Sequence, residues 1–372
     1  PVPRLLLEDI VRPAGNQISI LDLMILTSRP RNNMPKLLKS GLPMVQGLWV
    51  DPVAPHQNIS PPSEDGLDEF MNYDQLKQQI DDREVVLLDG GIGTEVLRRG
   101  YTWASHQLKS EPEMNLEIHQ DYIHAGADVI TTNTFQLSKR SFRAHFANND
   151  HLNAIGAEGL LNRARELIQD SVKLADKARK EAGQKDTFIA ASITTLEWCF
   201  RPDKTPDVEE IYDEYIEELS DYADAGADIF LFETFNSTSE GEVALKAAQE
   251  VGKPAWIAFV PYKDGKLLGG ETMAQVVDAM GPLKPDVLLL NCAPPDHITA
   301  GLEELAPIWG GPLGVYAHVG KFNPPEWMFT DEYPAERYRD ECQKWHDMGA
   351  TVIGGCCGTT PDYISLLKQS FA

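Results

Sequence analysis

The chain has 372 residues, too many for one small domain but suited to one large α/β barrel with an additional segment. Hydrophobic residues make up 42% of it and charged residues 24%, a composition that excludes an intrinsically disordered protein. The 57 acidic residues outnumber the 33 basic ones and give a net charge of −24, which excludes nucleic acid and anionic membrane surfaces as partners.

The first part of the chain has the composition of an irregular arm. Ten of its 25 prolines lie in the first 62 residues, and hydrophobic periodicity is hard to find there. This part lacks the basic region and apolar core of a signal peptide, and no stretch of the chain approaches the ~20 apolar residues of a membrane span. We therefore assign residues 1–83 to a proline-rich N-terminal extension with one or two short elements, which leaves the oligomeric state open.

From residue 84 onward, short apolar or β-branched runs alternate with helical stretches. The helical stretches, such as 154–182 and 208–225, place apolar residues at i, i+3 and i+4. Strands that alternate with helices pair in parallel through right-handed crossovers, and eight such units close into a barrel. The sequence therefore predicts an α/β fold, a (β/α)8 TIM barrel over residues 84–372. Its eight expected strands are 85–88, 128–132, 188–193, 228–233, 255–260, 286–291, 314–317 and 351–354.

An internal repetition indicates where two of these strands begin and end. Residues 121–135 read DYIHAGADVITTNTF, and residues 221–235 read DYADAGADIFLFETF. Each copy predicts a helix that ends at a left-handed glycine, followed by a tight turn and a buried strand. The pattern puts Thr132 and Glu233 at the C-terminal ends of the second and fourth strands, the face where TIM barrels carry their chemistry.

Three of the five cysteines follow expected strands. Cys292 follows the sixth strand in LLLNCAPP, and Cys356 and Cys357 follow the eighth in GGCCGTTP. Because only the seventh strand separates these strand ends in a closed barrel, the three sulfurs are expected to converge at one rim. Three protein ligands with one open position are typical of a catalytic zinc site, and sulfur ligands favour zinc. A vicinal disulfide or inert core thiols are the alternative interpretations of the adjacent pair.

The cysteine count also bears on the compartment. Five cysteines are too few, in a chain of this size, to be a disulfide framework, and an odd number cannot all pair. Such usage fits a reducing cytoplasm, where clustered cysteines bind metals or take part in catalysis. We therefore expect a cytoplasmic protein.

Five motifs together resemble the homocysteine S-methyltransferase family. This family includes betaine- and S-methylmethionine-dependent enzymes and the homocysteine barrel of cobalamin-dependent methionine synthase. The resemblance implies a zinc-dependent TIM barrel, an S-methyltransferase that transfers a methyl group to the thiol of homocysteine and so serves methionine biosynthesis. The motifs occur in the family order: LLDGGIGTEVLRRG (87–100), GADVITTNTFQ (126–136), FLFETF (230–235), LNCAPP (290–295) and GGCCGTTPDYI (354–364).

The resemblance also implies the residues of the site. A homocysteine ammonium needs a carboxylate, which Glu233 would supply, although a structural ion pair is the alternative role for that side chain. The substrate carboxylate needs N–H donors, which the turn at 90–93 can offer as an anion nest. Asn291 is expected to orient the loop of Cys292, with the satisfaction of backbone groups at the strand end as the alternative role. The implied Zn²⁺ ligands are Cys292, Cys356 and Cys357, and the implied amino-acid pocket contains Asp89, Gly90, Thr132 and Glu233.

The methyl donor is the least determined part of the expected reaction. A cationic methyl group suits an aromatic cage, with a cation–π attraction of roughly 0.5–2 kcal/mol per ring. Trp103, Trp198 and Trp327 lie in loops on the expected mouth side and are candidates, with ordinary packing as the alternative. Since the sequence contains no cobalamin- or folate-binding module, we favour a small onium donor: a betaine-like compound, S-methylmethionine or another sulfonium.

Two other functions remain open at this point. The first is a homocysteine- and zinc-binding subunit of a corrinoid-dependent methyl-transfer system, in which a partner protein carries the methyl group. The second is a different TIM-barrel lyase or aldolase, which would need a Schiff-base lysine on a strand; none is found, and the cysteine pair occupies the end of the eighth strand.

Overall fold

A computed structural model describes residues 71–101, 111–140, 149–323 and 326–371. It describes their side chains except those of 149–158, 160, 161, 322, 323 and 326. The proline-rich stretch before residue 71 and the candidate cage residue Trp103 lie outside the described residues.

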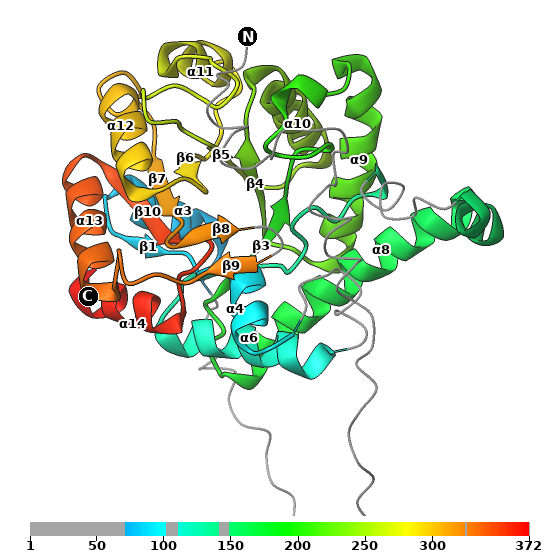
Figure 1. Cartoon of the computed structure of the whole chain (residues 1–372), viewed down its shortest axis with the longest axis horizontal. Helices are drawn as coiled ribbons and strands as arrows, with labels where there is room; N and C mark the ends of the chain where they lie inside the picture. Colours follow the sequence, from blue (N-terminus) through cyan, green and yellow to red (C-terminus); the bar gives the residue numbers. More distant parts are fainter. Residues whose placement is uncertain (1–70, 102–110, 141–148, 324–325, 372) are drawn as a thin grey trace, which may run out of the picture.

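Eight parallel strands form the centre of the molecule (Figure 1). Neighbours pair in the order β1-β10-β7-β6-β5-β4-β3-β2, and a parallel bridge between Leu88 and Val129 joins the two ends of this order. The predicted TIM barrel is therefore confirmed, and its strands arise from the eight predicted runs. They are β1 (Val86–Leu87), β2 (Val129–Thr131), β3 (Phe188–Ile193), β4 (Ile229–Phe235), β5 (Ala255–Phe259), β6 (Val287–Asn291), β7 (Leu313–Ala317) and β10 (Ala350–Gly355).

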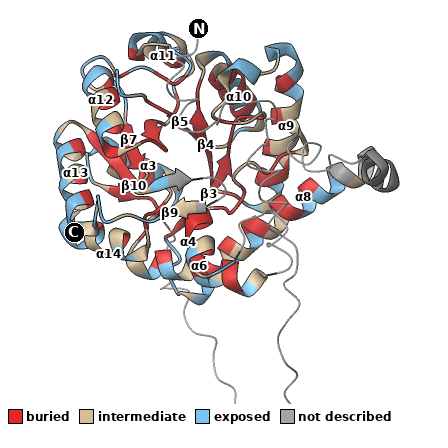
Figure 2. Ribbon diagram, in the orientation of Figure 1, coloured by how far each residue is buried: buried red, intermediate tan, exposed pale blue. Residues whose placement is uncertain are grey.

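Helices surround the barrel and bury their inner faces against it, while their outer faces are exposed (Figure 2). Gly126 and Gly226 end α6 and α9 with φ of 101° and 98°, the left-handed geometry that the repeated motif predicts. The surrounding helices are α4 (Ile92–Arg98), α6 (Pro112–Ala125), α8 (Asn149–Glu181), α9 (Val208–Ala225), α10 (Thr238–Val251), α11 (Met273–Met280), α12 (Pro295–Leu305), α13 (Ala335–Asp347) and α14 (Pro361–Phe371), with a short 3-10 turn at Pro202–Lys204.

The strands are buried on both faces, as parallel strands covered by helices must be. On β4, for example, Ile229 and Leu231 belong to a cluster inside the barrel, whereas Phe230 and Phe232 belong to the larger cluster between strands and helices. The alternation of strand side chains therefore builds two cores from one continuous apolar run. No helix in the described part of the chain is long and apolar enough to cross a membrane.

One more helix lies before the first strand, within the predicted extension. This helix, α3 (Tyr73–Asp81), begins at a capping box in which Asn72 and Gln75 bond each other's backbone. Leu76 and Ile80 on α3 are buried in the cluster inside the barrel. Trp256, near the start of β5, donates its indole N–H to the hydroxyl of Tyr73 at 2.8 Å. Helix α3 therefore closes the N-terminal end of the barrel, opposite to the end where the cysteines lie.

An antiparallel hairpin follows β7 on the cysteine side. Its strands are β8 (Lys321–Asn323) and β9 (Glu326–Met328), which form a two-stranded sheet with each other. In Figure 1 the hairpin lies in front of the barrel opening. It carries Trp327, one of the candidate cage residues.

Candidate active site

Three cysteine sulfurs meet at the C-terminal end of the barrel. The Sγ atoms of Cys292, Cys356 and Cys357 all lie within 4.8 Å of one another. Backbone bonds to β7, which lies between the two cysteine-bearing strands, set their positions: Cys292 N donates to Tyr316 O at 3.2 Å, and Cys356 N donates to Ala317 O at 2.9 Å. The sequence predicts these residues at the ends of two strands with one strand between them, and the structure brings their sulfurs together.

The loop that carries the cysteine pair is packed too closely for side chains at two glycines. A Cβ at Gly355 would lie 2.1 Å from Oγ1 of Thr359, and one at Gly358 would lie 1.9 Å from the carbonyl oxygen of Val319. Gly358 also has a φ of 85°, which a glycine adopts without strain. These glycines allow the loop to turn sharply beside β7, where Val319 N donates to Cys357 O at 2.8 Å.

The turn after β1 is bonded to the same cysteine loop. Gly358 N donates to Oγ1 of Thr94 at 2.9 Å, and Gly91 N donates to Oγ1 of Thr359 at 3.3 Å. Gly90 lies against the hydroxyls of Thr359 and Tyr122, each of which would be 2.8 Å from an added Cβ. The predicted anion nest at 90–93 is thus part of the wall beside the sulfur cluster.

The three thiols influence one another strongly. Hydrogen bonds from Cys292 and Cys356 hold the pKa of Cys357 well below its usual range, because they stabilise its thiolate. The pKa of Cys292 is raised, first by its hydrogen bonds to the other two sulfurs and then by burial. A cation among these sulfurs would replace the shared protons and compensate the burial of thiolates.

The donor set fits a metal ion of the zinc type. Four ligands at Zn–S distances of about 2.3 Å in a tetrahedron leave about 3.8 Å between sulfurs. The upper separation of 4.8 Å among the three sulfurs is close to this value. Soft thiolates favour zinc over calcium or magnesium, which prefer oxygen ligands. Three protein ligands would leave a fourth position for a substrate atom.

Glu233, at the end of β4, presents a buried carboxylate near the sulfurs. Oε2 accepts a hydrogen bond of 3.2 Å from the hydroxyl of Tyr316, and Oε1 accepts one from Ser192. Its partners among the described residues are these two hydroxyls, and no lysine, arginine or histidine there pairs with it. Burial raises its pKa to about 7, and the Cys356 sulfur adds to the effect. A cationic ligand would therefore stabilise the charged form of this buried carboxylate.

Asp89, two residues after the end of β1, presents a second buried carboxylate. Its oxygens accept bonds from the backbone N–H of Thr131 at 2.7 Å and from its hydroxyl at 3.1 Å. Burial is the main cause that raises the pKa of Asp89 to about 8, and the charge of Glu233 raises it further. The two carboxylates thus lie near enough to repel each other, and a bound ammonium would relieve that repulsion.

The predicted pocket residue Thr132 bonds within the barrel. Its Oγ1 accepts a hydrogen bond of 3.0 Å from Ser192 N and lies 2.6 Å from Oγ1 of Thr134. Through Ser192 it joins β2 to the side chain that holds Glu233. The predicted loop-orienting residue Asn291 bonds to Thr234, at the end of β4.

Two of the three candidate cage tryptophans are described, and they contact different neighbours. The ring of Trp327 lies edge-on to that of His318, with 5.6 Å between centroids, and its indole nitrogen would be 2.9 Å from a Cβ at Gly358. Trp327 is therefore beside the cysteine loop. Trp198 lies after β3, with its ring 6.3 Å from that of Phe200.

Sequence reasoning did not single out several side chains that the structure brings to this site. Ser192 and Tyr316 hold the Glu233 carboxylate, and Thr131 holds that of Asp89. A hydroxyl inside an otherwise apolar strand run is the signal that they share, as in FIAASI for Ser192. His318 directly follows β7, and burial lowers its pKa, an effect that the Cys356 sulfur opposes.

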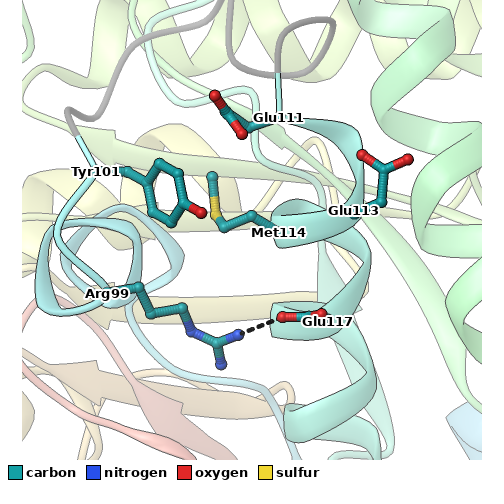
Figure 3. Close-up of a pocket in the computed structure, with 6 residues that line it drawn as sticks. All are labelled: Arg99, Tyr101, Glu111, Glu113, Met114 and Glu117. Carbon is teal, nitrogen blue, oxygen red and sulfur yellow. Dashed lines mark ion pairs between the residues drawn. The ribbon is translucent and has the colours of Figure 1, made fainter. Parts of the chain in front are cut away.

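A separate cavity of about 430 Å³ lies between the end of α4 and the start of α6 (Figure 3). Arg99 faces Glu117 across it, with 3.7 Å between nitrogen and oxygen. None of the three clustered cysteines lines this cavity. Its lining residues are Arg99, Tyr101, Glu111, Glu113, Met114 and Glu117.

Comparison with known proteins decides the family. Residues 86–371 match the family model described as homocysteine S-methyltransferase. This chain belongs to the homocysteine S-methyltransferase family. The expected resemblance is therefore confirmed, and with it the enzyme class, since the family consists of methyltransferases.

Curated relatives agree with this assignment. A homocysteine S-methyltransferase of Escherichia coli is 29% identical over 314 residues, which cover 79% of this chain and 97% of the relative. Homocysteine S-methyltransferase YbgG of Bacillus subtilis is 29% identical, with 78% and 95% covered. A selenocysteine Se-methyltransferase of Brassica oleracea is also 29% identical, with 76% and 88% covered.

A solved structure supports the fold and the metal chemistry of this family. The metallated form of the homocysteine methyltransferase MmuM from Escherichia coli superposes with a TM-score of 0.66 at 28% identity. The match covers 79% of this chain and 99% of MmuM.

Proposed function

We propose that this protein transfers a methyl group from a small onium donor to the thiol of homocysteine, and so forms methionine, with Zn²⁺ held by Cys292, Cys356 and Cys357. The single observation that carries the proposal is the convergence of three cysteine sulfurs within 4.8 Å at the C-terminal end of the barrel. The family of the chain and the metallated relative MmuM support it.

The bound Zn²⁺ would supply one effect, a lower pKa for the substrate thiol, whose ordinary value of about 8.5 leaves it mostly protonated at neutral pH. The residues of the chain bind and orient the rest of the substrate. Glu233 and Asp89 receive the ammonium, because both carboxylates are buried without a cationic partner among the described residues. N–H groups of the turn at 90–93 other than that of Gly91, which already donates to Thr359, receive the carboxylate.

The chemical step is a displacement at the methyl carbon. The electron pair of the homocysteine sulfur forms the new S–CH₃ bond, while the bond from that carbon to the onium nitrogen or sulfur of the donor breaks. The electron pair of the broken bond stays on the onium atom of the donor, and that atom becomes neutral as the donor leaves. The thiol proton passes to solvent when the thiolate forms, before the transfer. The methyl group keeps its three hydrogens, so no base acts on it. Positioning of the two substrates in line supplies much of the acceleration.

The donor would bind on the open side of the sulfur cluster. Trp327 and His318 form an aromatic wall beside the cysteine loop, and such rings attract a cationic methyl group. We propose Trp327 as the first cage residue to test, followed by Trp198 and Trp103. S-Methylmethionine, another sulfonium or a betaine-like compound carries the required charge.

Two competing functions make different predictions. A Schiff-base lyase needs a strand lysine, and none of the eight described barrel strands carries one. A zinc- and homocysteine-binding subunit of a corrinoid system would bind homocysteine but would not form methionine from a small donor.

A methyl-transfer assay separates these functions. Purified, reduced protein would be incubated with homocysteine and a panel of S-methylmethionine, other sulfonium donors and betaine, with and without a zinc chelator. Methionine formed from one small donor, and lost on chelation, supports the proposed function. Methionine that appears only when a methylated corrinoid protein is added would favour the subunit, and chelator-insensitive turnover would remove zinc from the proposal.

A further inference from the structure

Asn291 and Thr234 exchange two hydrogen bonds deep in the barrel mouth. The backbone N–H of Thr234 donates to Oδ1 of Asn291 at 3.1 Å, and Nδ2 of Asn291 donates to Oγ1 of Thr234 at 3.1 Å. Both residues are 0% exposed. Because buried polar groups are costly without partners, each side chain depends on the other for its hydrogen bonds.

This contact joins two strands that are not neighbours in the sheet. Thr234 is the last residue but one of β4, Asn291 is the last residue of β6, and β5 lies between the two strands in the sheet. The register between β4 and β5 shifts between Phe232 and Phe235, where a step of three residues along β4 matches a step of two along β5. Such a bulge turns the extra residue out of the strand pairing, and here it turns Thr234 toward Asn291.

The backbone near the contact is in an unusual conformation on both sides. Thr234 has a φ of 66° and Cys292 a φ of 50°, in the left-handed region that residues other than glycine seldom adopt. Thr234 is β-branched, so its conformation is the more costly of the two. Strain of this kind persists where surrounding bonds hold it, and the two hydrogen bonds to Asn291 do so for Thr234.

The contact joins the two halves of the substrate site through adjacent residues. Thr234 directly follows Glu233, the carboxylate proposed for the ammonium, and Asn291 directly precedes Cys292, a proposed metal ligand. We propose that Thr234 and Asn291 form a positioning clamp that fixes the spacing between the ammonium site and the sulfur cluster, and thereby selects homocysteine over the shorter cysteine. This inference rests on the proposed function and deepens it.

The physical reason is the fixed length of the ligand. An amino-acid thiol must reach from the Glu233 carboxylate to the cluster, and cysteine is one methylene shorter than homocysteine. A rigid site discriminates one methylene by roughly tenfold or more, whereas a site whose two ends can approach each other accommodates both. The clamp therefore controls discrimination, while the ligands themselves control metal binding.

The test compares amino-acid binding by four variants with that of the wild type. Thr234→Val removes the hydroxyl at constant shape, Thr234→Ser keeps it, Asn291→Ala removes the amide, and the double variant Thr234→Val/Asn291→Ala removes both. Thr351→Val is the matched control, because Thr351 is also a buried strand threonine, with a 3.4 Å bond to Leu313 O at the other end of the barrel.

Each protein would be loaded with Co²⁺, whose absorption spectrum reports thiol binding, and titrated with homocysteine and with cysteine. We expect Thr234→Val and Asn291→Ala to keep Co²⁺ but to reduce the homocysteine preference roughly tenfold. Thr234→Ser and Thr351→Val should keep the wild-type preference. The double variant should resemble the worse single variant, because the two substitutions break the same contact.

The outcomes separate failure of the clamp from failure of the proposed function. A wild-type protein that binds neither Co²⁺ nor homocysteine would overturn the proposed function. A wild type that binds both, with an unchanged preference in Thr234→Val and Asn291→Ala, would overturn the clamp alone. An equal loss of homocysteine preference in Thr351→Val would also overturn the clamp, because the removal of any buried threonine hydroxyl would then have the same effect.

Discussion

The hydroxyl of Tyr316 donates a hydrogen bond of 3.2 Å to Oε2 of Glu233, from β7 to β4. On the other carboxylate oxygen, Ser192 of β3 donates a second bond. Two hydroxyl donors thus oppose the rise in the pKa of Glu233 that burial causes. They also fix the direction of the carboxylate, as a binding site for a substrate ammonium requires.

Replacing Tyr316 by phenylalanine is expected to weaken homocysteine binding. The change removes one hydrogen bond to a charged group, worth about 1.5–3 kcal/mol, and part of this loss should appear as a roughly tenfold higher KM for homocysteine. Zinc content should not change. The matched control is Tyr212→Phe, which removes a tyrosine–glutamate bond of 2.6 Å to Glu250 on the surface. Equal KM values in the two variants would contradict the role of Tyr316.

Glu233→Gln should separate substrate binding from metal binding. The amide has nearly the shape of the carboxylate but no charge, so the homocysteine ammonium loses its main partner, and affinity for homocysteine should fall at least tenfold. The sulfur cluster is untouched, so bound zinc should remain. Calorimetric titration with homocysteine, together with metal analysis of the same sample, measures both quantities. Unchanged affinity would move the ammonium contact to another residue.

His119 is expected to make the fold sensitive to acid. It is 0% exposed on α6, its ring nitrogens have no hydrogen-bond partner among the described residues, and burial lowers its pKa from 6.5 to about 4. Because the unfolded chain binds a proton below pH 6.5 and the folded chain does not, stability falls as the pH falls from 6.5 toward 4. Between pH 7 and pH 5 the loss from this residue should be about 2 kcal/mol.

Denaturant unfolding of the wild type and His119→Phe at these two pH values measures the effect. The variant should lose about 2 kcal/mol less than the wild type between pH 7 and pH 5, because phenylalanine does not titrate. If both proteins show the same pH dependence, the histidine does not stay neutral in the folded state.

Leu76→Ala tests whether α3 is part of the barrel fold. Leu76 is 1% exposed in the cluster inside the barrel, so its truncation should lower the free energy of unfolding by about 2–5 kcal/mol. Lys77→Ala, one residue further along the same helix, should change it by less than about 0.5 kcal/mol. Similar stability of the two variants, measured by denaturant unfolding, would mean that α3 is dispensable.

The strands and the cysteine cluster could be predicted because each depends on local sequence and barrel topology. Runs such as Phe188–Ile193 have the length and composition of buried strands, and their observed bounds agree with the prediction. Once strands six and eight are assigned, the closed barrel brings Cys292 to the adjacent pair without any further information.

The interactions between side chains of different strands could not be predicted in the same way. The Thr234–Asn291 contact depends on the bulge in β4. A bulge shifts the strand register by one residue, and no pattern in this sequence marks where that shift occurs. The Tyr316–Glu233 bond joins residues 83 positions apart whose polarity alone does not pair them. Helix α3 lies in the predicted extension, where the sequence predicted one or two short elements without bounds, because nine residues give too few helical turns to fix a periodic pattern.

Metal analysis of the purified, reduced protein tests the central claim most directly. The wild type should hold stoichiometric zinc, and Cys292→Ala and Cys357→Ala should each lose it while their circular dichroism shows a folded barrel, because two sulfurs cannot replace three. Cys199→Ala, which removes a buried thiol outside the cluster, should keep the metal. A wild type without bound metal, or full zinc content in Cys292→Ala or Cys357→Ala, would contradict the account.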